Sequence, residues 1–169
     1  MGVVGDAEDG LRAIHNGATI LQLRAPSMSA RRLEEEARML IGASRVPVLV
    51  SARCDVALAC GAAGVNLPER DVPIEDARRL LGDRIVGRSV HSVEAALGAE
   101  AQGADYVIFG PVWASASHVG EAARGVAALA AVAAAVRIPV LAIGGVTRER
   151  VDECLAAGAA GYAAIRMFL

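Results

Sequence analysis

Ile138-Pro139-Val140-Leu141-Ala142-Ile143-Gly144-Gly145-Val146 is an apolar run that ends at two adjacent glycines. An apolar run without polar alternation predicts a parallel strand covered on both faces, and Pro139 suits its start because it has no N–H to donate. Gly144 and Gly145 allow the following backbone N–H groups to turn toward an anion. Thr147 would cap a new helix whose N-terminal end favours the same anion. These residues predict either a phosphate-binding loop or an ordinary strand-to-helix turn.

A sequence pattern recurs on either side of this stretch. In each copy, glycine precedes a short apolar run. The pattern occurs at residues 17–23, 61–67, 103–109 and 158–165. Each occurrence predicts a helix that ends at glycine and is followed at once by a strand. Further strand-like runs lie at residues 2–5, 46–51, 84–89 and 138–143, which brings the predicted strands to eight.

Helical patterns fill the intervals between these strands. They lie at residues 8–16, 29–42, 56–61, 74–81, 93–102, 126–136 and 148–157. Eight strands that alternate with helices predict a (β/α)8 TIM barrel, and a doubly wound open sheet is the alternative.

The predicted barrel is compact and lacks its final helix. Residues 1–169 form a single barrel domain in this interpretation, although such barrels usually have ~200 residues or more. Only Met167, Phe168 and Leu169 follow the last predicted strand. We therefore expect either a fragment or a homodimer whose partner subunit covers the seam between the first and last helices.

Composition narrows the class of protein. The formal net charge of -2 gives no electrostatic reason to expect nucleic acid or a membrane surface as a partner. No apolar run approaches the ~18 residues of a membrane span, and Cys54, Cys60 and Cys154 form no pair motif, so we expect a soluble, cytoplasmic protein with buried thiols. Every basic residue is arginine, which excludes Schiff-base chemistry and a lysine phosphate clamp.

Polar residues follow several predicted strands, where the chemistry of such barrels is found. The predicted substrate contacts at these strand ends are Gln22, Arg24, Ser51, Asn66, Ser89, Ser115 and Ser117. The loops after strands seven and eight often bind phosphate in these barrels, and here they supply Gly144, Gly145 and Arg166. For Arg166 the alternative is a surface ion pair with Glu149 or Asp152.

Two histidines are candidates for proton transfer near neutral pH. His91 follows the fifth strand and is either a ligand contact or a residue at the start of the next helix. His118 lies in a segment of small residues and is either an acid–base group or a solvated loop residue. Asp71 and Glu69 could bind a metal ion weakly, but two carboxylates alone do not make a metal site.

Five motifs carry a resemblance to a known family. They are Gln22-Leu23-Arg24, Gly64-Val65-Asn66-Leu67, Gly87-Arg88-Ser89-Val90-His91-Ser92, Ala104-Asp105-Tyr106-Val107-Ile108-Phe109-Gly110-Pro111-Val112 and Ala142-Ile143-Gly144-Gly145-Val146. With them, the sequence from Thr19 to Ile165 resembles the thiamine phosphate synthase and TenI superfamily of barrels. The resemblance implies a thiazole phosphate site at Gly145 and Ile165, with Arg166 where the family often has serine.

The synthase of this superfamily joins a pyrimidine pyrophosphate to a thiazole phosphate with Mg2+, and its pattern differs from this sequence at three places. Its Gln-x-Arg-x-Lys motif, Asn-Asp pair and Thr-x-Thr-Lys segment correspond to Gln22-Leu23-Arg24-Ala25-Pro26, Ser51-Ala52 and Ser115-Ala116-Ser117-His118. Asp71 matches a second magnesium carboxylate. Because pyrophosphate departure needs cations, these differences favour a TenI-type protein, which the motif from Gly87 to Ser92 most resembles.

The resemblance therefore predicts a TenI-like thiazole phosphate tautomerase of thiamine biosynthesis that binds a phosphorylated thiazole and needs no cofactor. In that branch a histidine believed to be catalytic follows the strand-six glycine, where this chain has Pro111, so His118 or His91 would move the proton. One alternative is a thiamine phosphate synthase that holds Mg2+ at Asp71. The other is a non-catalytic regulatory protein that binds a phosphorylated ligand.

Overall fold

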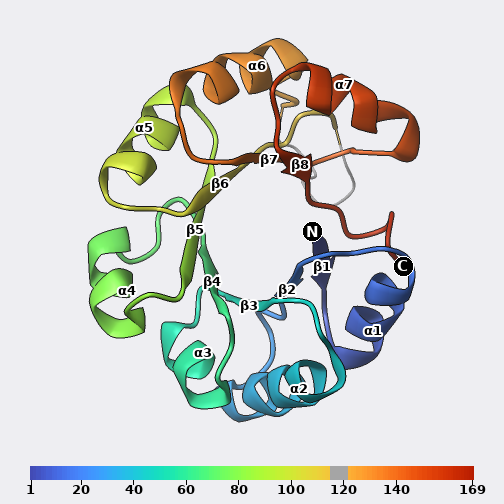
Figure 1. Ribbon diagram of the computed structural model, residues 1–169, viewed down its shortest axis with the longest axis vertical. Helices are drawn as coiled ribbons and strands as arrows, with labels where there is room; N and C mark the ends of the chain where they lie inside the picture. Colours follow the sequence, from blue (N-terminus) through green and yellow to red (C-terminus); the bar gives the residue numbers. More distant parts are fainter. Residues whose placement is uncertain (115–121) are drawn as a thin grey trace.

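The computed structural model describes residues 1–114 and 122–169. Eight parallel strands follow one another in sequence order, and helices surround them (Figure 1). The strands are β1 (Gly2–Val4), β2 (Leu21–Leu23), β3 (Val48–Ser51), β4 (Gly64–Leu67), β5 (Ile85–Val90), β6 (Tyr106–Phe109), β7 (Val140–Ala142) and β8 (Gly161–Tyr162). The helices are α1 (Ala7–His15), α2 (Ala30–Ala43), α3 (Cys54–Cys60), α4 (Ile74–Leu81), α5 (Val93–Ala101), α6 (Val126–Ala135), the 3-10 helix η1 (Arg148–Arg150) and α7 (Val151–Ala156).

The sheet closes on itself just beyond β8. Gly2 of β1 forms a parallel bridge with Ala164. The Val3 N–H donates to the Ala164 carbonyl at 3.0 Å, and the Ala164 N–H donates to the Met1 carbonyl at 3.1 Å. The predicted TIM barrel is therefore confirmed, and the open doubly wound sheet is wrong.

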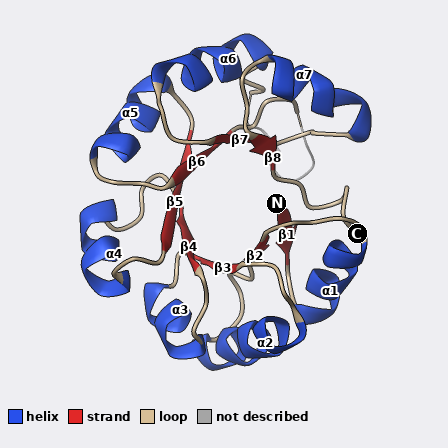
Figure 2. Cartoon of the chain, viewed as in Figure 1, coloured by secondary structure: helices blue, strands red, loops and turns tan. Residues whose placement is uncertain are grey.

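The core has two layers, separated by the sheet. Figure 2 shows the strands as an inner ring and the helices outside it. The larger apolar cluster lies between these rings, whereas a small cluster fills the barrel interior and consists of Met1, Val3, Leu49, Tyr106, Ile108 and Ala163. Small helix residues such as Ala37 and Ala96 are fully buried, which lets the helices approach the sheet closely.

The segment after β8 covers part of the seam that was expected to need a partner subunit. No helix follows β8 in the part of the chain that the structure describes, and the chain runs toward α1 instead (Figure 1). Phe168 is buried, and its ring stacks on Tyr162 with 5.9 Å between ring centroids. The Asn16 side chain donates to the Phe168 carbonyl at 2.9 Å. Phe168 thus packs the C-terminal segment against β8 and the end of α1.

The element after β7 differs from the predicted helix at residues 148–157. It begins with the 3-10 helix η1, and the Thr147 side chain makes no capping hydrogen bond to it. Thr147 instead hydrogen-bonds the Glu149 carboxylate, which lowers the pKa of that group. The prediction that Thr147 caps this helix is therefore wrong.

Two features expected from composition can be compared with the structure. The three cysteines are buried and unpaired as predicted, and burial raises the pKa of each thiol. Among the residues described, no helix combines the length and the hydrophobicity needed to cross a bilayer.

Candidate functional site

A cavity of about 200 Å³ opens at the carboxyl ends of the strands. The predicted site residues that line it are Gln22, Arg24, Ser51, Asn66, Ser89, His91 and Ile165. Glu69, Gly110 and Ile143 also line it. These residues, which lie in or shortly after seven different strands, therefore meet at one mouth, as the position of chemistry in such barrels predicts.

Paired polar side chains form the floor of this mouth cavity. Gln22 donates to the Ser51 hydroxyl oxygen at 3.2 Å, and Asn66 donates to the Ser89 hydroxyl oxygen at 3.0 Å. Gln22 and Asn66 are both buried. Because each serine oxygen accepts a hydrogen bond from an amide, each serine proton is directed to another acceptor, which a ligand in the cavity can supply.

Tyr106 orients the Asn66 amide, a role that the sequence analysis missed. Its hydroxyl donates to Asn66 Oδ1 at 3.1 Å in a buried position. The ring reaches Asn66 by crossing β5 at Gly87, where an added Cβ would lie only 2.1 Å from Tyr106 Cζ. A glycine inside a strand often marks such a close approach, and Gly87 was the available signal.

Tyr106→Phe tests this contact directly. Removal of the hydroxyl leaves buried Asn66 Oδ1 without its donor, so we expect the free energy of unfolding to fall by about 1 to 3 kcal/mol. Urea unfolding followed by circular dichroism measures the change. Tyr162→Phe is the control, because the Tyr162 ring stacks on Phe168 at the C-terminal segment away from Asn66, and its stability should change less. Equal losses in the two variants would contradict the role of Tyr106.

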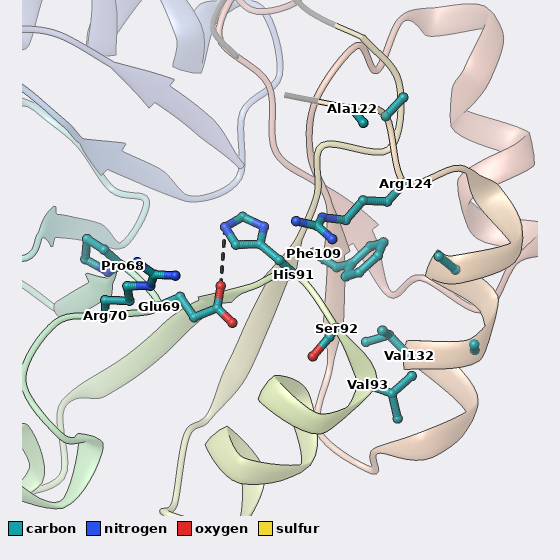
Figure 3. Close-up of a pocket in the computed structure, with 13 residues that line it drawn as sticks. Pro68, Glu69, Arg70, His91, Ser92, Val93, Phe109, Ala122, Arg124 and Val132 are labelled. Atoms are coloured by element: carbon teal, nitrogen blue, oxygen red, sulfur yellow. Dashed lines mark ion pairs between the residues drawn. The ribbon is translucent and has the colours of Figure 1, made fainter. Parts of the chain in front are cut away.

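His91 is held from both sides of its ring. Its Nδ1 lies 2.5 Å from the Gly110 carbonyl oxygen, so Nδ1 carries the proton and donates. Its Nε2 lies 3.6 Å from the Glu69 carboxylate, and Arg124 Nε donates to the same Gly110 carbonyl at 3.2 Å. Figure 3 shows the imidazole with Glu69 on one side and Arg124 on the other. His91 is therefore held in one orientation by protein groups at the edge of the mouth cavity.

A larger cavity of about 980 Å³ adjoins the mouth cavity and shares Pro68, Glu69 and His91 with it (Figure 3). Its wall is apolar along α6, where Ala128 and Val132 line it. The two cavities therefore meet at the β4–α4 loop and at His91.

The loop between β4 and α4 carries the carboxylates Glu69 and Asp71. Glu69 lines the mouth, whereas Asp71 lines a neighbouring cavity of about 380 Å³, and its Oδ1 accepts the Val72 N–H at 2.7 Å. Residues 1–114 and 122–169 contain no cluster of three or more histidine, cysteine or carboxylate groups that could hold a metal by itself. Mg2+ needs only one or two carboxylates when substrate phosphates complete its shell, and this donor set fits that arrangement.

Gly144 and Gly145 of the candidate phosphate loop are also required by the packing of that loop. Gly144 and Gly145 have φ of 90° and 67°. An added Cβ would lie 2.5 Å from Pro111 at Gly144 and 2.7 Å from Trp113 at Gly145. Arg150 further holds this loop, because it donates to the Gly145 carbonyl at 2.7 Å and lies 4.8 Å over the Trp113 ring. Both glycines therefore allow the loops after β6 and β7 to pack together.

Two backbone donors of the same loop have no acceptor in the part of the chain that the structure describes. Within the described residues, the N–H groups of Gly144 and Gly145 donate to no protein acceptor. Ile165 lines the mouth cavity and Arg166 is exposed directly after it. These residues are compatible with a bound phosphate at the loops after β7 and β8. The remaining predicted residues, Ser115, Ser117 and His118, lie outside the described residues.

Comparison with known proteins decides the family. The family model described as "Thiamine monophosphate synthase" matches residues 7–168. The chain belongs to the thiamine monophosphate synthase family. It is 42% identical over 159 residues to the thiamine-phosphate synthase of Chlorobium luteolum, an alignment that covers 91% of this chain and 75% of that protein. It is 44% identical over 161 residues to the thiamine-phosphate synthase of Anaeromyxobacter dehalogenans, covering 93% and 72%.

A solved structure agrees with this placement. The thiamine phosphate pyrophosphorylase from Pyrococcus furiosus superimposes with a TM-score of 0.88 at 35% identity, covering 96% of this chain and 83% of that chain. FabK from Thermotoga maritima shares the fold, with a TM-score of 0.80 at 21% identity over 98% of this chain and 58% of that chain.

These findings overturn the predicted TenI-like tautomerase. The relatives with 37–44% identity are named thiamine-phosphate synthase, or putative synthase, rather than tautomerase. The prediction gave too much weight to the two positions where the family pattern has lysine and this chain has Pro26 and His118. Arg24 and Arg124 place permanent positive charge around the two cavities, so loss of lysine is not loss of cations. His91, one of the two predicted proton carriers, is engaged by Gly110 and Glu69.

Proposed function

We propose that this protein is a thiamine-phosphate synthase. In the reaction that the family resemblance implies, a thiazole phosphate nitrogen forms a bond to the methylene carbon of a pyrimidine pyrophosphate. The carbon–oxygen bond to pyrophosphate breaks, and pyrophosphate leaves with the bonding electron pair. The observation that carries the proposal is the similarity to named synthases over about nine tenths of this chain.

The mouth cavity supports this proposal because its polar groups suit a heteroaromatic ring. The Ser51 and Ser89 hydroxyls can each donate a hydrogen bond to a ring nitrogen of a substrate. Gln22 and Asn66 hold those hydroxyls in place. Rigid donors of this kind orient a substrate before reaction.

Two anionic groups must be bound at once, and separate parts of the site can bind them. The thiazole phosphate would lie at the loops after β7 and β8, at Gly144, Gly145, Ile165 and Arg166. The guanidinium of Arg24 would contact the pyrophosphate, with which it can form paired charge-assisted hydrogen bonds. Magnesium held by Asp71, with Glu69 nearby, would stabilise the charge that develops on the departing pyrophosphate.

Pyrophosphate release tests the proposed reaction. With both substrates and Mg2+ present, a pyrophosphatase-coupled phosphate assay should show steady release. Omission of the thiazole phosphate should stop it, because productive departure of pyrophosphate requires the acceptor nitrogen to be in place. Release that proceeds equally without the thiazole phosphate would indicate a hydrolase and contradict the proposal.

A further inference from the structure

Arg88 of β5 occupies a position where an apolar residue would be expected. Its neighbours on either side, Gly87 and Ser89, contact Tyr106 and Asn66 in the barrel interior, so the alternation of a strand directs Arg88 outward toward the helices. It shares this outer side with Val86 and Val90, both fully buried, and it is itself only 5% exposed. Burial lowers the pKa of its guanidinium, which indicates that this placement is costly.

The guanidinium is satisfied by the backbone of the loop that joins β4 to α4. Arg88 Nη1 donates to the Pro68 carbonyl at 2.6 Å and to the Glu69 carbonyl at 3.4 Å. Arg88 Nη2 donates to the Val72 carbonyl at 2.6 Å. The planar guanidinium therefore joins the first and last parts of the loop. The ammonium group of a lysine is a single point charge and would join them less well.

The same loop carries both candidate carboxylates. Val72, whose carbonyl Arg88 holds, donates its N–H to Asp71 Oδ1 at 2.7 Å. Glu69, whose carbonyl Arg88 also contacts, presents its side chain to His91 and the mouth cavity. The charges of Asp71 and Glu69 also act favourably on the guanidinium. Each carboxylate is thus one residue or less from a backbone group that Arg88 fixes.

We propose that Arg88 is a positioning residue that holds the loop from Pro68 to Val72, and with it Asp71 and Glu69, ready to bind a divalent cation. This proposal rests on the proposed function, because that function supplies the need for a cation. Arg88 itself contacts neither substrate nor cation. Groups that orient metal ligands typically change metal affinity by about 10- to 100-fold when they are removed.

The chain offers a matched control at the opposite end of the barrel. Arg78 of α4 likewise donates to three backbone carbonyls, those of Gly82, Arg84 and Gly103, and it also pairs with Asp105 at 2.7 Å. These partners lie at the amino ends of β5 and β6, away from Asp71. Removal of Arg78 should cost stability without any effect on cation binding.

The experiment is a titration of the full chain with Mn2+ in the presence of pyrophosphate, with free Mn2+ measured by electron paramagnetic resonance. Arg88→Met should weaken Mn2+ binding by about tenfold or more, whereas Arg78→Met should leave it within about twofold. Arg88→Lys keeps the charge but loses the planar fork, so it should fold and still bind Mn2+ several-fold more weakly than the unaltered chain. Thermal melting checks that each variant is folded.

Equal Mn2+ affinities in Arg88→Lys, Arg78→Met and the unaltered chain would overturn the positioning role, as would failure of the unaltered chain to bind Mn2+. The proposed function is judged separately by thiamine phosphate formation. If Arg88 variants lose Mn2+ affinity but the unaltered chain makes no thiamine phosphate, the positioning role stands and the proposed function fails. If thiamine phosphate forms and Mn2+ affinity does not depend on Arg88, the proposed function stands and the positioning role fails.

Discussion

Asp71→Asn is expected to lower kcat/KM for thiamine phosphate formation by about 100-fold or more, the size of effect typical when a group that stabilises transition-state charge is lost. The substitution keeps the size of the side chain and the oxygen that accepts the Val72 N–H. It removes the negative charge that magnesium requires, so charge on the departing pyrophosphate is no longer stabilised. Steady-state kinetics at several Mg2+ concentrations measure the effect, and higher Mg2+ should restore part of the rate.

Asp76→Asn is the control for this prediction. Asp76 lies five residues further along in α4, and its carboxylate pairs with Arg79 at 2.9 Å on the surface. The rate should stay within about twofold of the unaltered chain, because a surface ion pair contributes little. If Asp71→Asn were as active as Asp76→Asn at every Mg2+ concentration, Asp71 would not hold the metal.

Gly64→Ala is expected to destabilise the barrel by more than about 3 kcal/mol, a large share of the ~5 to 15 kcal/mol that stabilises a typical domain. An added Cβ at Gly64 would lie 1.9 Å from the Ile85 carbonyl oxygen. That atom belongs to the backbone of the adjacent strand β5, so no side chain can rotate to relieve the clash. Urea unfolding, or the yield of soluble folded protein, measures the loss.

Gly98→Ala separates this packing effect from the intrinsic difference between glycine and alanine. Gly98 lies in the middle of α5, and no atom lies within 4 Å of its added Cβ. Alanine is the better helix former, so stability should rise by about 0.5 to 1 kcal/mol. A Gly64→Ala variant as stable as Gly98→Ala would show that β4 and β5 separate more easily than their packing indicates.

The barrel could be predicted because its information is local and repeated. Each stretch in which glycine precedes apolar residues indicates the end of a helix and the start of a strand. This pattern alone placed β4, Gly64–Leu67, correctly. The polar residues at strand ends were also brought together, because parallel strands around a barrel place their carboxyl ends on one face. Gln22, Ser51, Asn66 and Ser89 meet at the mouth for this reason.

The rest of the site depends on contacts between residues distant in sequence. Tyr106 and Asn66 are 40 positions apart, and no local sequence pattern around either residue indicates their hydrogen bond. Strand alternation directs Arg88 outward, where it holds carbonyls of the β4–α4 loop that lie 16 to 20 positions earlier in the sequence. The choice between synthase and tautomerase also failed, because it counted missing lysines one by one and did not weigh Arg24 and Arg124, which line the two cavities.

Mass spectrometry of the reaction products is the sharpest test of the proposal that this barrel joins two substrates with loss of pyrophosphate. The purified chain is incubated with the pyrimidine pyrophosphate, the thiazole phosphate and Mg2+, and thiamine phosphate is followed over time. Thiamine phosphate is expected to accumulate in step with pyrophosphate, and EDTA or omission of either substrate should prevent its formation. If a folded protein that binds the thiazole phosphate formed no thiamine phosphate, the proposed synthase activity would be wrong.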